Sequence, residues 1–575
     1  MLRRIFSYMK EYKKYAWLAL ICIGVEVVLE IMVPKLMADL IDIGVTNSDV
    51  PYIINKGIQM AVCAVAALIL GVGSARFSAL AGQGLGANIR KAEYEKLQSY
   101  SFSNIDHFSV SSLVTRLTSD VTNIQNAVST GMRPFGRSLV MLIFATTLAF
   151  QINSTLALVF LVALPVLAVL LIIIIINVGP RYGRMQGAVD LVNRCIEENL
   201  TAVRVVKSYV RGDYEIEKFR NVNDNLKNES EKAFGIAVLN MPAMQFVMYS
   251  TILGILLIGG RLINSGQMMI GQLTSFLSYV LLILNSLMMM SNVFLLMTRS
   301  LASAERIMKV IDEPIDITDE NAKDIEVKKG EIEFNHVWFK YNETAKEYVL
   351  SDVSFHINAG QTVGIIGQTG SSKTTLIQLI PRLYDASKGE IKIDGINVKE
   401  YPVRHLRDAI SVVLQKNTLF SGSLIDNLRW GDENATLDEI KEACSIACVD
   451  EFIDRLPGGF DAEMGQEGVN VSGGQKQRIC IARAILKKPK VLILDDSTSA
   501  VDTATEGKIR NALAKKLPDM TKIIIAQRIS SVCHADQIII MDGGRVDAIG
   551  THESLLRTNK IYQEIYESQK EGADL

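Results

Sequence analysis

Long apolar stretches dominate the first ~300 residues of the chain, and the remainder has the mixed polar and apolar pattern of an α/β domain. A helix crosses a bilayer with about 20 mostly apolar residues. Six stretches reach that length, at about 16–36, 57–80, 135–154, 156–178, 241–261 and 272–296. The pattern therefore predicts six membrane-spanning helices and a multi-pass protein of the cell (plasma) membrane.

Basic residues lie on one side of these spans. The segments "LRR", "KEYKK", "NIRKAEYEK" and "RVVKSYVRGDYEIEKF" carry Lys and Arg, whereas the opposite connections "IDIGVTNSDVPY", "QINST" and "LINSGQMMIG" are nearly free of them. Because cytoplasmic connections carry the excess of Lys and Arg, both termini are predicted to be cytosolic. No small-residue cleavage site follows the basic start, so the first apolar run is interpreted as a membrane helix and not as a signal peptide.

The two long cytosolic connections, residues 81–134 and 179–240, keep apolar periodicity without being apolar overall. This favours helices that continue past the membrane and turn near "SFSNIDHFSV" and "SYVRGDYE". The predicted organisation is a transmembrane domain over 1–310 with two cytosolic helical extensions, a linker over 311–330, an α/β domain over 331–568 and a tail over 569–575. The α/β domain starts with "EIEFNHVWFKY", which alternates like a strand.

Charge and cysteine content exclude some other classes of protein. The formal net charge is −2, so the chain lacks the basic footprint of a nucleic-acid-binding protein. The seven cysteines form neither paired metal knuckles nor a disulfide-like framework. Cys444 and Cys448 share helical spacing, and we interpret this lone pair as core.

A phosphate-binding loop is predicted within "VGIIGQTGSSKTTLIQLI", which is typical of a strand, a loop and the start of a helix. Gly367 to Thr374 matches G-x-x-x-x-G-K-[ST] except that Ser372 replaces the second glycine. Loop amides and the helix dipole favour an anion there. Lys373 is expected to reach the β- and γ-phosphates and Thr374 to ligate Mg²⁺. Serine suits a helix N-terminus, so we expect nucleotide binding to survive.

A second element of the site is "VLILDDSTSAVD", an apolar strand that ends in two carboxylates. Asp495 closes the strand and is expected to hold Mg²⁺ beside a phosphate. Upstream, "VSGGQKQR" places a Ser-Gly-Gly run at the start of a helix, where free amides and a hydroxyl face an anion. We interpret this run as a second phosphate-binding surface.

Together these motifs resemble the nucleotide-binding domain of ATP-binding cassette (ABC) transporters, and the six preceding spans resemble a type I exporter half-transporter. The resemblance implies an all-α six-helix transmembrane domain followed by an α/β P-loop nucleotide-binding domain, with ATP and Mg²⁺ as cofactors. It makes Tyr341 the residue that stacks on adenine, Gln415 the Q-loop residue that reaches Mg²⁺, Ser499–Asp502 the D-loop, and "SNIDHF" and "VRGDYE" the coupling helices. The implied nucleotide-binding residues are Tyr341, Gly367, Gln368, Thr369, Gly370, Ser371, Ser372, Lys373, Thr374, Thr375, Gln415, Ser472, Gly473, Gly474, Gln475 and Asp502, and the implied Mg²⁺ ligands are Thr374, Gln415 and Asp495.

Two positions depart from the family pattern. The catalytic glutamate is replaced by Asp496, which is one methylene shorter, and the switch histidine is replaced by Gln527, which cannot carry a proton. Both losses in one chain indicate the degenerate half of a heterodimeric exporter. In the family each ATP lies between one chain's phosphate loop and the other chain's signature motif, which the resemblance places here at Ser472–Gln475. The expected partner is therefore a homologous half-transporter that keeps Glu and His.

The transported substrate is weakly encoded. Glu26 and Glu30 lie one turn apart inside the first span, where carboxylates are costly and face a cavity or a partner. They either attract lipophilic cations or form a structural pair bonded to neighbouring helices. Multidrug export is the favoured function. One alternative is a lipid or glycolipid flippase, for which Arg76 is the only hint of a basic cavity. Another is a nucleotide-gated sensor or channel.

Overall fold

The computed structural model describes residues 2–320, 322–496 and 500–571. The chain divides into two compact units. The first comprises Met1–Gln98 and Val110–Asp312, and the second comprises Ser99–Ser109 and Glu313–Leu575. The segment Ser99–Ser109, which the sequence placed within the transmembrane domain, thus groups with the second unit. The domain boundaries given above stay a prediction.

The described residues of the first unit form helices joined by short turns, with no strand among them. Among them, six segments are long and apolar enough to cross a membrane, which confirms the predicted six-helix architecture and identifies a multi-pass membrane protein. The helices of this unit are α1 (Leu2–Ser7), η1 (Lys10–Tyr12), α2 (Lys13–Asp39), η2 (Leu40–Val45), α3 (Val50–Gln98), α5 (Val110–Thr115), η3 (Arg116–Asp120), α6 (Val121–Ser129), α7 (Met132–Ile152), α8 (Ser154–Thr201), α9 (Val203–Ser208), α10 (Gly212–Ala237), α11 (Asn240–Asn264) and α12 (Ile270–Asp312).

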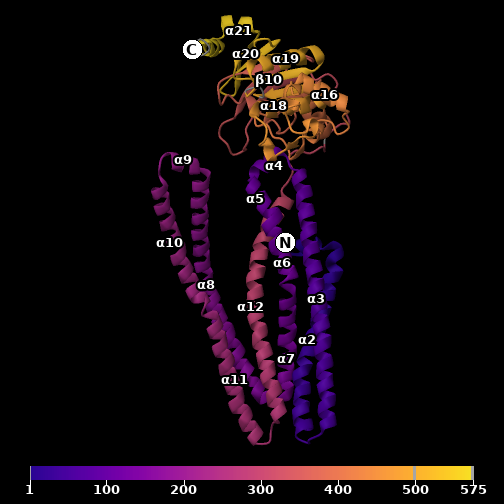
Figure 1. Cartoon of the computed structure of the whole chain (residues 1–575), viewed down its shortest axis with the longest axis vertical. Coiled ribbons are helices and arrows are strands. Elements are labelled where there is room, and N and C mark those ends of the chain that lie inside the picture. The colour runs from indigo at the N-terminus through magenta and orange to yellow at the C-terminus, as the bar shows by residue number, and fades with distance from the viewer. Residues whose placement is uncertain (1, 321, 497–499, 572–575) are drawn as a thin grey trace. The chain divides into compact units, whose positions relative to one another are not determined.

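Several of these helices are much longer than a bilayer requires. Helix α3 has 49 residues and α8 has 48. At a rise of 1.5 Å per residue each is roughly 70 Å long, about twice the hydrocarbon thickness. Helices α8 and α10 run side by side beyond the apolar stretches, with the short α9 at their tip (Figure 1). This arrangement agrees with the expectation of helices that continue past the membrane.

The surface of α8 shows why its central part suits a lipid environment. Exposed Val162, Val166, Val169, Ile173 and Ile176 recur every three or four residues along it. Residues at that spacing share one helical face. Exposing such a continuous apolar stripe to water would cost free energy, whereas contact with the hydrocarbon chains of lipids would not.

The second unit is built on a six-stranded sheet with strand order β12-β11-β3-β10-β9-β6 and a four-stranded sheet with order β2-β1-β4-β5. Its elements are α4 (Phe102–His107), β1 (Ile332–Phe339), β2 (Leu350–Ile357), β3 (Thr362–Ile366), α13 (Lys373–Gln378), β4 (Lys388–Ile393), β5 (Ile396–Asn397), η4 (Val398–Glu400), α14 (Val403–Asp408), β6 (Ile410–Val413), β7 (Gly422–Ser423), α15 (Leu424–Arg429), α16 (Leu437–Ile446), α17 (Asp450–Ile453), η5 (Gly459–Asp461), β8 (Glu463–Met464), η6 (Gln466–Gly468), α18 (Gly473–Leu486), β9 (Val491–Asp495), α19 (Thr503–Lys516), β10 (Thr521–Ile525), α20 (Ile529–Val532), β11 (Gln537–Asp542), β12 (Arg545–Gly550), α21 (His552–Thr558) and α22 (Lys560–Glu571).

Four neighbouring parallel strands, β3, β10, β9 and β6, position the site. They are rich in Val, Ile and Leu, as expected of strands buried on both faces. Their register pairs Ile525 with both Ile365 and Asp495. Because carboxyl ends of parallel strands meet at one edge of the sheet, the loops after β3, β9 and β10 converge there. The predicted α/β nucleotide-binding fold is confirmed.

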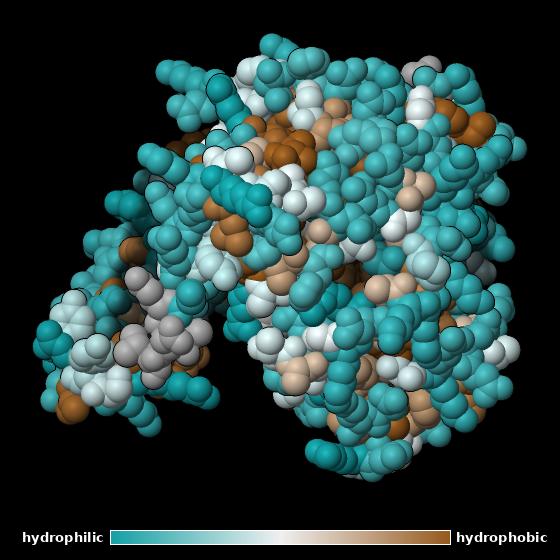
Figure 2. Space-filling view, turned by 90° about the horizontal axis from the view of Figure 1, so that it is seen from above, coloured by the Kyte–Doolittle hydropathy of each residue, from teal (hydrophilic) through white to brown (hydrophobic). Residues whose placement is uncertain are grey.

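Polar side chains cover most of the face seen from above, with apolar side chains in small patches (Figure 2). This polar face contrasts with the exposed apolar stripe of α8 in the first unit.

The cysteines expected in the core, Cys444 and Cys448, are both buried. Cys444 lies in α16, whereas Cys448 follows the end of that helix in a left-handed conformation.

Candidate functional site

The loop between β3 and α13 surrounds the ammonium group of Lys373. This ammonium group donates to the carbonyl oxygens of Gly367 at 2.8 Å and Gln368 at 2.9 Å, and to the hydroxyl of Ser371 at 3.2 Å. Burial lowers the pKa of Lys373, and the charges of Asp495 and Asp496 oppose that shift. A half-desolvated cation held only by neutral oxygens is suited to an anionic ligand.

Ser372 occupies the N-cap position of α13 in the left-handed region, with φ at +67°. Its side chain makes no capping hydrogen bond. The reason given above for tolerance, that serine suits a helix N-terminus, is therefore wrong for this position. The position requires a conformation that glycine adopts freely and that costs other residues roughly 1–2 kcal/mol.

Asp495 and Thr374 form the candidate metal-binding edge. The Thr374 hydroxyl donates to Asp495 Oδ1 at 3.2 Å. The other carboxylate oxygen, Oδ2, is buried and has no hydrogen-bond partner in the described part of the chain. Burial raises the pKa of Asp495, with the nearby charge of Asp496 adding to the shift. An orphaned carboxylate oxygen beside a hydroxyl is a donor set that fits Mg²⁺, which prefers oxygen ligands.

Asp496 and Gln527, the two departures from the family pattern, bond to each other. Gln527 Nε2 donates to Asp496 Oδ2 at 2.9 Å, and the Gln415 side chain also hydrogen-bonds Asp496. Asp496 has a positive φ of +47°. Burial raises the pKa of Asp496, while the Lys373 ammonium and the Gln527 bond act in the opposite direction. The sequence indicated the two substitutions but not this direct contact.

One cavity of about 310 Å³ gathers most of the predicted residues. Its lining includes the loop residues Thr369, Gly370, Ser371, Ser372, Lys373, Thr374 and Thr375, together with Gln415, Asp495, Asp496, Ile525 and Gln527. Tyr341, which follows β1, lies next to this loop and shares a hydrogen bond of 2.9 Å between its hydroxyl and that of Thr375.

The signature residues lie at the start of α18 and do not line this cavity. Ser472 and Gln475 form a capping box: the Ser472 side chain accepts from the Gln475 amide, and Gln475 Oε1 accepts from the Ser472 amide at 2.9 Å. A Cβ at Gly474 would lie 2.7 Å from the carbonyl oxygen of Ala500, so the D-loop backbone passes directly over this glycine. Asp502 caps α19 by accepting from the Thr505 amide at 2.9 Å. Ser499, the first predicted D-loop residue, is outside the described residues.

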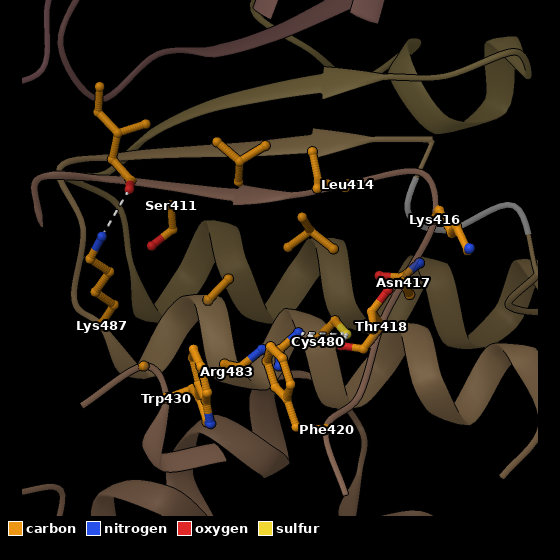
Figure 3. A pocket seen from close by; sticks show the side chains of 15 residues that line it. Ser411, Leu414, Lys416, Asn417, Thr418, Phe420, Trp430, Cys480, Arg483 and Lys487 are labelled. Carbon is orange, nitrogen blue, oxygen red and sulfur yellow. Dashed lines mark hydrogen bonds between the residues drawn. The ribbon is translucent and has the colours of Figure 1, made fainter. Parts of the chain in front are cut away.

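A second cavity, of about 370 Å³, adjoins the Q-loop (Figure 3). Phe420 and Trp430 stack there with ring centroids 4.1 Å apart, and the Arg483 guanidinium lies 5.9 Å from the Phe420 ring. Trp430 is 65% exposed and Phe420 44%. Two stacked, exposed aromatic rings beside a cavity form an apolar shelf, which the sequence analysis missed.

In the first unit, Glu26 and Glu30 of α2 are ion-paired with arginines of α7. Arg133 Nη2 lies 2.9 Å from Glu26 Oε1, and Arg137 reaches Glu26 at 3.3 Å and Glu30 at 2.6 Å. Arg133 and Arg137 are thus further basic residues in this region, so the prediction that Arg76 is the only hint of a basic cavity is wrong. Arg137 stands inside the predicted third span, where a charge needs a partner. The position of Arg137 within a span could therefore have indicated from the sequence alone that it has an acidic partner.

Comparison with known proteins agrees with this geometry. Residues 16–287 match the ABC transporter transmembrane region, and residues 350–499 match the ABC transporter domain. An uncharacterized ABC transporter ATP-binding protein of Bacillus subtilis, YfiB, is 37% identical over 575 residues and covers 100% of both chains.

Two further relatives have names that specify a cargo. A Bacillus subtilis protein whose name assigns it to multidrug export, YgaD, is 32% identical over 84% of this chain and 83% of its own. An ATP-dependent lipid A-core flippase of Pseudomonas putida is 32% identical over 98% of this chain and 95% of its own.

A solved structure has the same fold as this chain. A bacterial Atm1-family ABC exporter with ATP bound superposes with a TM-score of 0.83 at 22% identity, covering 98% of each chain. The family matches and the full-length relatives thus agree with the order of the two units along the chain. The chain belongs to the ABC transporter family and is a half-transporter of exporter fold, with a transmembrane region followed by an ATP-binding domain.

Proposed function

We propose that this chain exports lipophilic or drug-like compounds as one half of a heterodimeric ABC exporter, and that it contributes the catalytically impaired ATP site. The observation that carries the proposal is the hydrogen bond between Asp496 and Gln527. The two residues that replace the family's acid and switch occupy one corner of the nucleotide cavity and are engaged with each other.

This contact has consequences for chemistry. A glutamine amide donates a hydrogen bond but neither takes up nor releases a proton. The shorter Asp496 side chain is turned toward that amide and toward Gln415. The site is therefore suited to holding ATP and poorly suited to activating a water molecule.

The remainder of the site keeps its binding groups. Lys373 supplies a positive charge, and Thr374, Gln415 and Asp495 are the residues that would hold Mg²⁺. When bound, Mg²⁺ neutralises phosphate charge. At the capped start of α18 the Gln475 amide is bonded to the Ser472 side chain, so the amides of Gly473 and Gly474 are the ones that would face a phosphate of the partner's ATP. An intact signature beside an impaired acid is the asymmetry expected of such a subunit.

We propose the shelf of Phe420 and Trp430 as the docking site for a cytosolic extension of the partner. The corresponding tip of this chain exposes Tyr209, Val210 and Tyr214. A homologous partner would present similar apolar side chains to the shelf. Aromatic residues are enriched among the few that carry most of the binding free energy at interfaces. Because that extension of the partner would be cytosolic, the ATP-binding domain and both termini of this chain would lie in the cytosol as well.

The test is ATP turnover by the purified chain alone and after co-expression with a half-transporter that keeps Glu and His. We expect the isolated chain to bind ATP and hydrolyse it very slowly, and the pair to turn over. Robust Mg²⁺-dependent hydrolysis by the isolated chain would contradict the proposal. Failure of every complete partner to restore turnover would favour the nucleotide-gated sensor.

A lipid flippase is the second candidate. The name of the Pseudomonas putida relative and the presence of the basic residues Arg133 and Arg137 beside α2 favour it. Reconstitution of the pair in vesicles with fluorescent phospholipids or with lipophilic dyes separates the two. ATP-dependent movement of lipid but not of dye would select the flippase.

A further inference from the structure

Tyr384 links helix α4 to the tyrosine that we assign to adenine. It is 9% exposed and lies in the segment between α13 and β4. Its hydroxyl donates to Asp106 Oδ2 at 2.6 Å, and its ring lies 6.1 Å from the ring of Phe102. Asp106 and Phe102 both belong to α4. The first cytosolic turn of the chain is thus anchored on Tyr384.

The same ring supports Tyr341 from the side. The rings of Tyr341 and Tyr384 meet edge to face, with centroids 5.2 Å apart at an angle of 87°. Phe339 makes a second edge contact with Tyr341, at 4.9 Å. Tyr341 nevertheless remains 48% exposed. A ring that is fixed by perpendicular neighbours and still accessible is ready to stack on a base.

Tyr384 itself has little freedom. Arg382, two residues before it, pairs with Asp385 at 2.9 Å, and the Arg382 carbonyl accepts from Arg407 at 2.8 Å. Burial raises the pKa of the Tyr384 phenol, and the bond to Asp106 adds to this shift. The phenol therefore stays protonated and keeps donating to the carboxylate, a charge-assisted bond of the stronger kind.

We propose that Tyr384 is a positioning residue, which fixes the face of Tyr341 that stacks on adenine and couples it to α4 through Asp106. The inference rests on the proposed ATP site and on the stacking role of Tyr341. Coupling of this kind is reciprocal. Binding of the base therefore favours the seated position of α4, and loss of the α4 contact weakens binding of the base.

The experiment measures binding to the full-length chain in lipid nanodiscs. Mg-ATP is titrated beside Mg-tripolyphosphate, which carries phosphates without a base. We expect Tyr384→Leu to weaken Mg-ATP about tenfold, since part of the base stacking is lost, and to leave tripolyphosphate unchanged. Tyr384→Phe and Asp106→Ala are each expected to weaken Mg-ATP by about threefold, and their combination by no more than either alone, because they remove one bond.

The matched control is Tyr401→Phe. Tyr401 is also a buried tyrosine of this unit and donates to the Ile393 carbonyl at 2.9 Å, so its variant should bind both ligands normally. Equal weakening of both ligands by the Tyr384 variants would assign them a merely structural role and overturn the inference. Additive losses in the double variant would also overturn it.

Failure of the underlying site has a different signature. If Tyr341→Ala leaves Mg-ATP binding unchanged, the adenine assignment is wrong and the inference falls with it. If Tyr341→Ala weakens Mg-ATP selectively while both Tyr384 variants bind normally, the ATP site stands and the role of Tyr384 is wrong.

Discussion

Position 496 carries a carboxylate one methylene shorter than the family's glutamate, and its contact at position 527 is an amide in place of an imidazole. Restoring both is the residue-level test. Acid–base and positioning groups each contribute roughly 10²–10⁴-fold in rate, so neither Asp496→Glu nor Gln527→His should suffice alone. We expect the double variant to show a modest gain in hydrolysis. Full turnover from either single variant would contradict this account.

In the proposed heterodimer Lys373 and Ser472 would serve different ATP molecules, so their variants should differ. We expect Lys373→Ala to weaken nucleotide binding at this chain's site and to leave some turnover, and Ser472→Ala to abolish nearly all turnover. The control is Ser423→Ala, because Ser423 caps α15 with a similar capping box outside the nucleotide cavity. Equal effects of the Lys373 and Ser472 variants on turnover of the pair would refute the assignment.

Ser372 allows a test of backbone strain. We expect Ser372→Gly to raise the free energy of unfolding of the ATP-binding domain by about 1 kcal/mol, because glycine adopts φ +67° without a steric penalty. The neighbouring Ser371→Gly should instead destabilise it, since Ser371 is buried and its hydroxyl accepts from Lys373. Thermal melts of the two variants provide the comparison, and a lower melting temperature for Ser372→Gly would count against strain.

Much of the site could be predicted from sequence because its residues follow strands and open helices. Asp495 ends an apolar run, and Lys373 starts a helix after a glycine-containing loop. The bond between Asp496 and Gln527 could not be predicted in this way, because it depends on how β9 and β10 align, which a motif does not specify. The left-handed backbone of Ser372 is local to the loop, and the glycine that the motif places at this position was the available signal for it.

At the scale of elements, α2 and α7 are joined by a cluster of two carboxylates and two guanidinium groups. This pairing favours the structural interpretation of Glu26 and Glu30 over a free cation site. Removing one partner of a buried ion pair leaves an uncompensated charge. Glu26 is 5% exposed, so its loss matters most.

We therefore expect Glu26→Gln to lower the stability of the transmembrane unit by about 3 kcal/mol, at the low end for a buried pair because Arg133 and Arg137 are partly exposed, and to reduce transport of cationic and neutral compounds alike. Asp39→Asn is the control, because Asp39 pairs with Lys56 but its side chain is 38% exposed. Melting curves and transport assays are compared. Selective loss of cation transport with an unchanged melt would restore the cation-site interpretation.

The long helices could be predicted because hydropathy and length set them, whereas their irregularities could not. Segments η2 and η3 are π-helical turns within otherwise apolar or amphipathic stretches. Such turns are rare single turns inside longer helices, and the apolar pattern of the sequence does not mark where they occur. Pairing of α7 arginines with α2 carboxylates is likewise a tertiary contact, although the charge of Arg137 within a span indicated that a partner was needed.

At the scale of the whole molecule, the proposed function makes this chain half of an ATPase. The chain would supply one cavity that holds ATP, together with a signature motif that would complete the site of its partner. The impaired site would then stay occupied between turnovers and hold the two ATP-binding domains together.

The most direct test is hydrolysis of bound ATP in the heterodimer after the partner's catalytic glutamate is replaced by glutamine. That change silences the competent site, so any remaining hydrolysis reports on Asp496 and Gln527. The account predicts that radiolabelled ATP remains bound and largely uncleaved over a time in which the unmodified pair completes many turnovers. Rapid release of phosphate in that background would show that Asp496 is an adequate base and would contradict the claim.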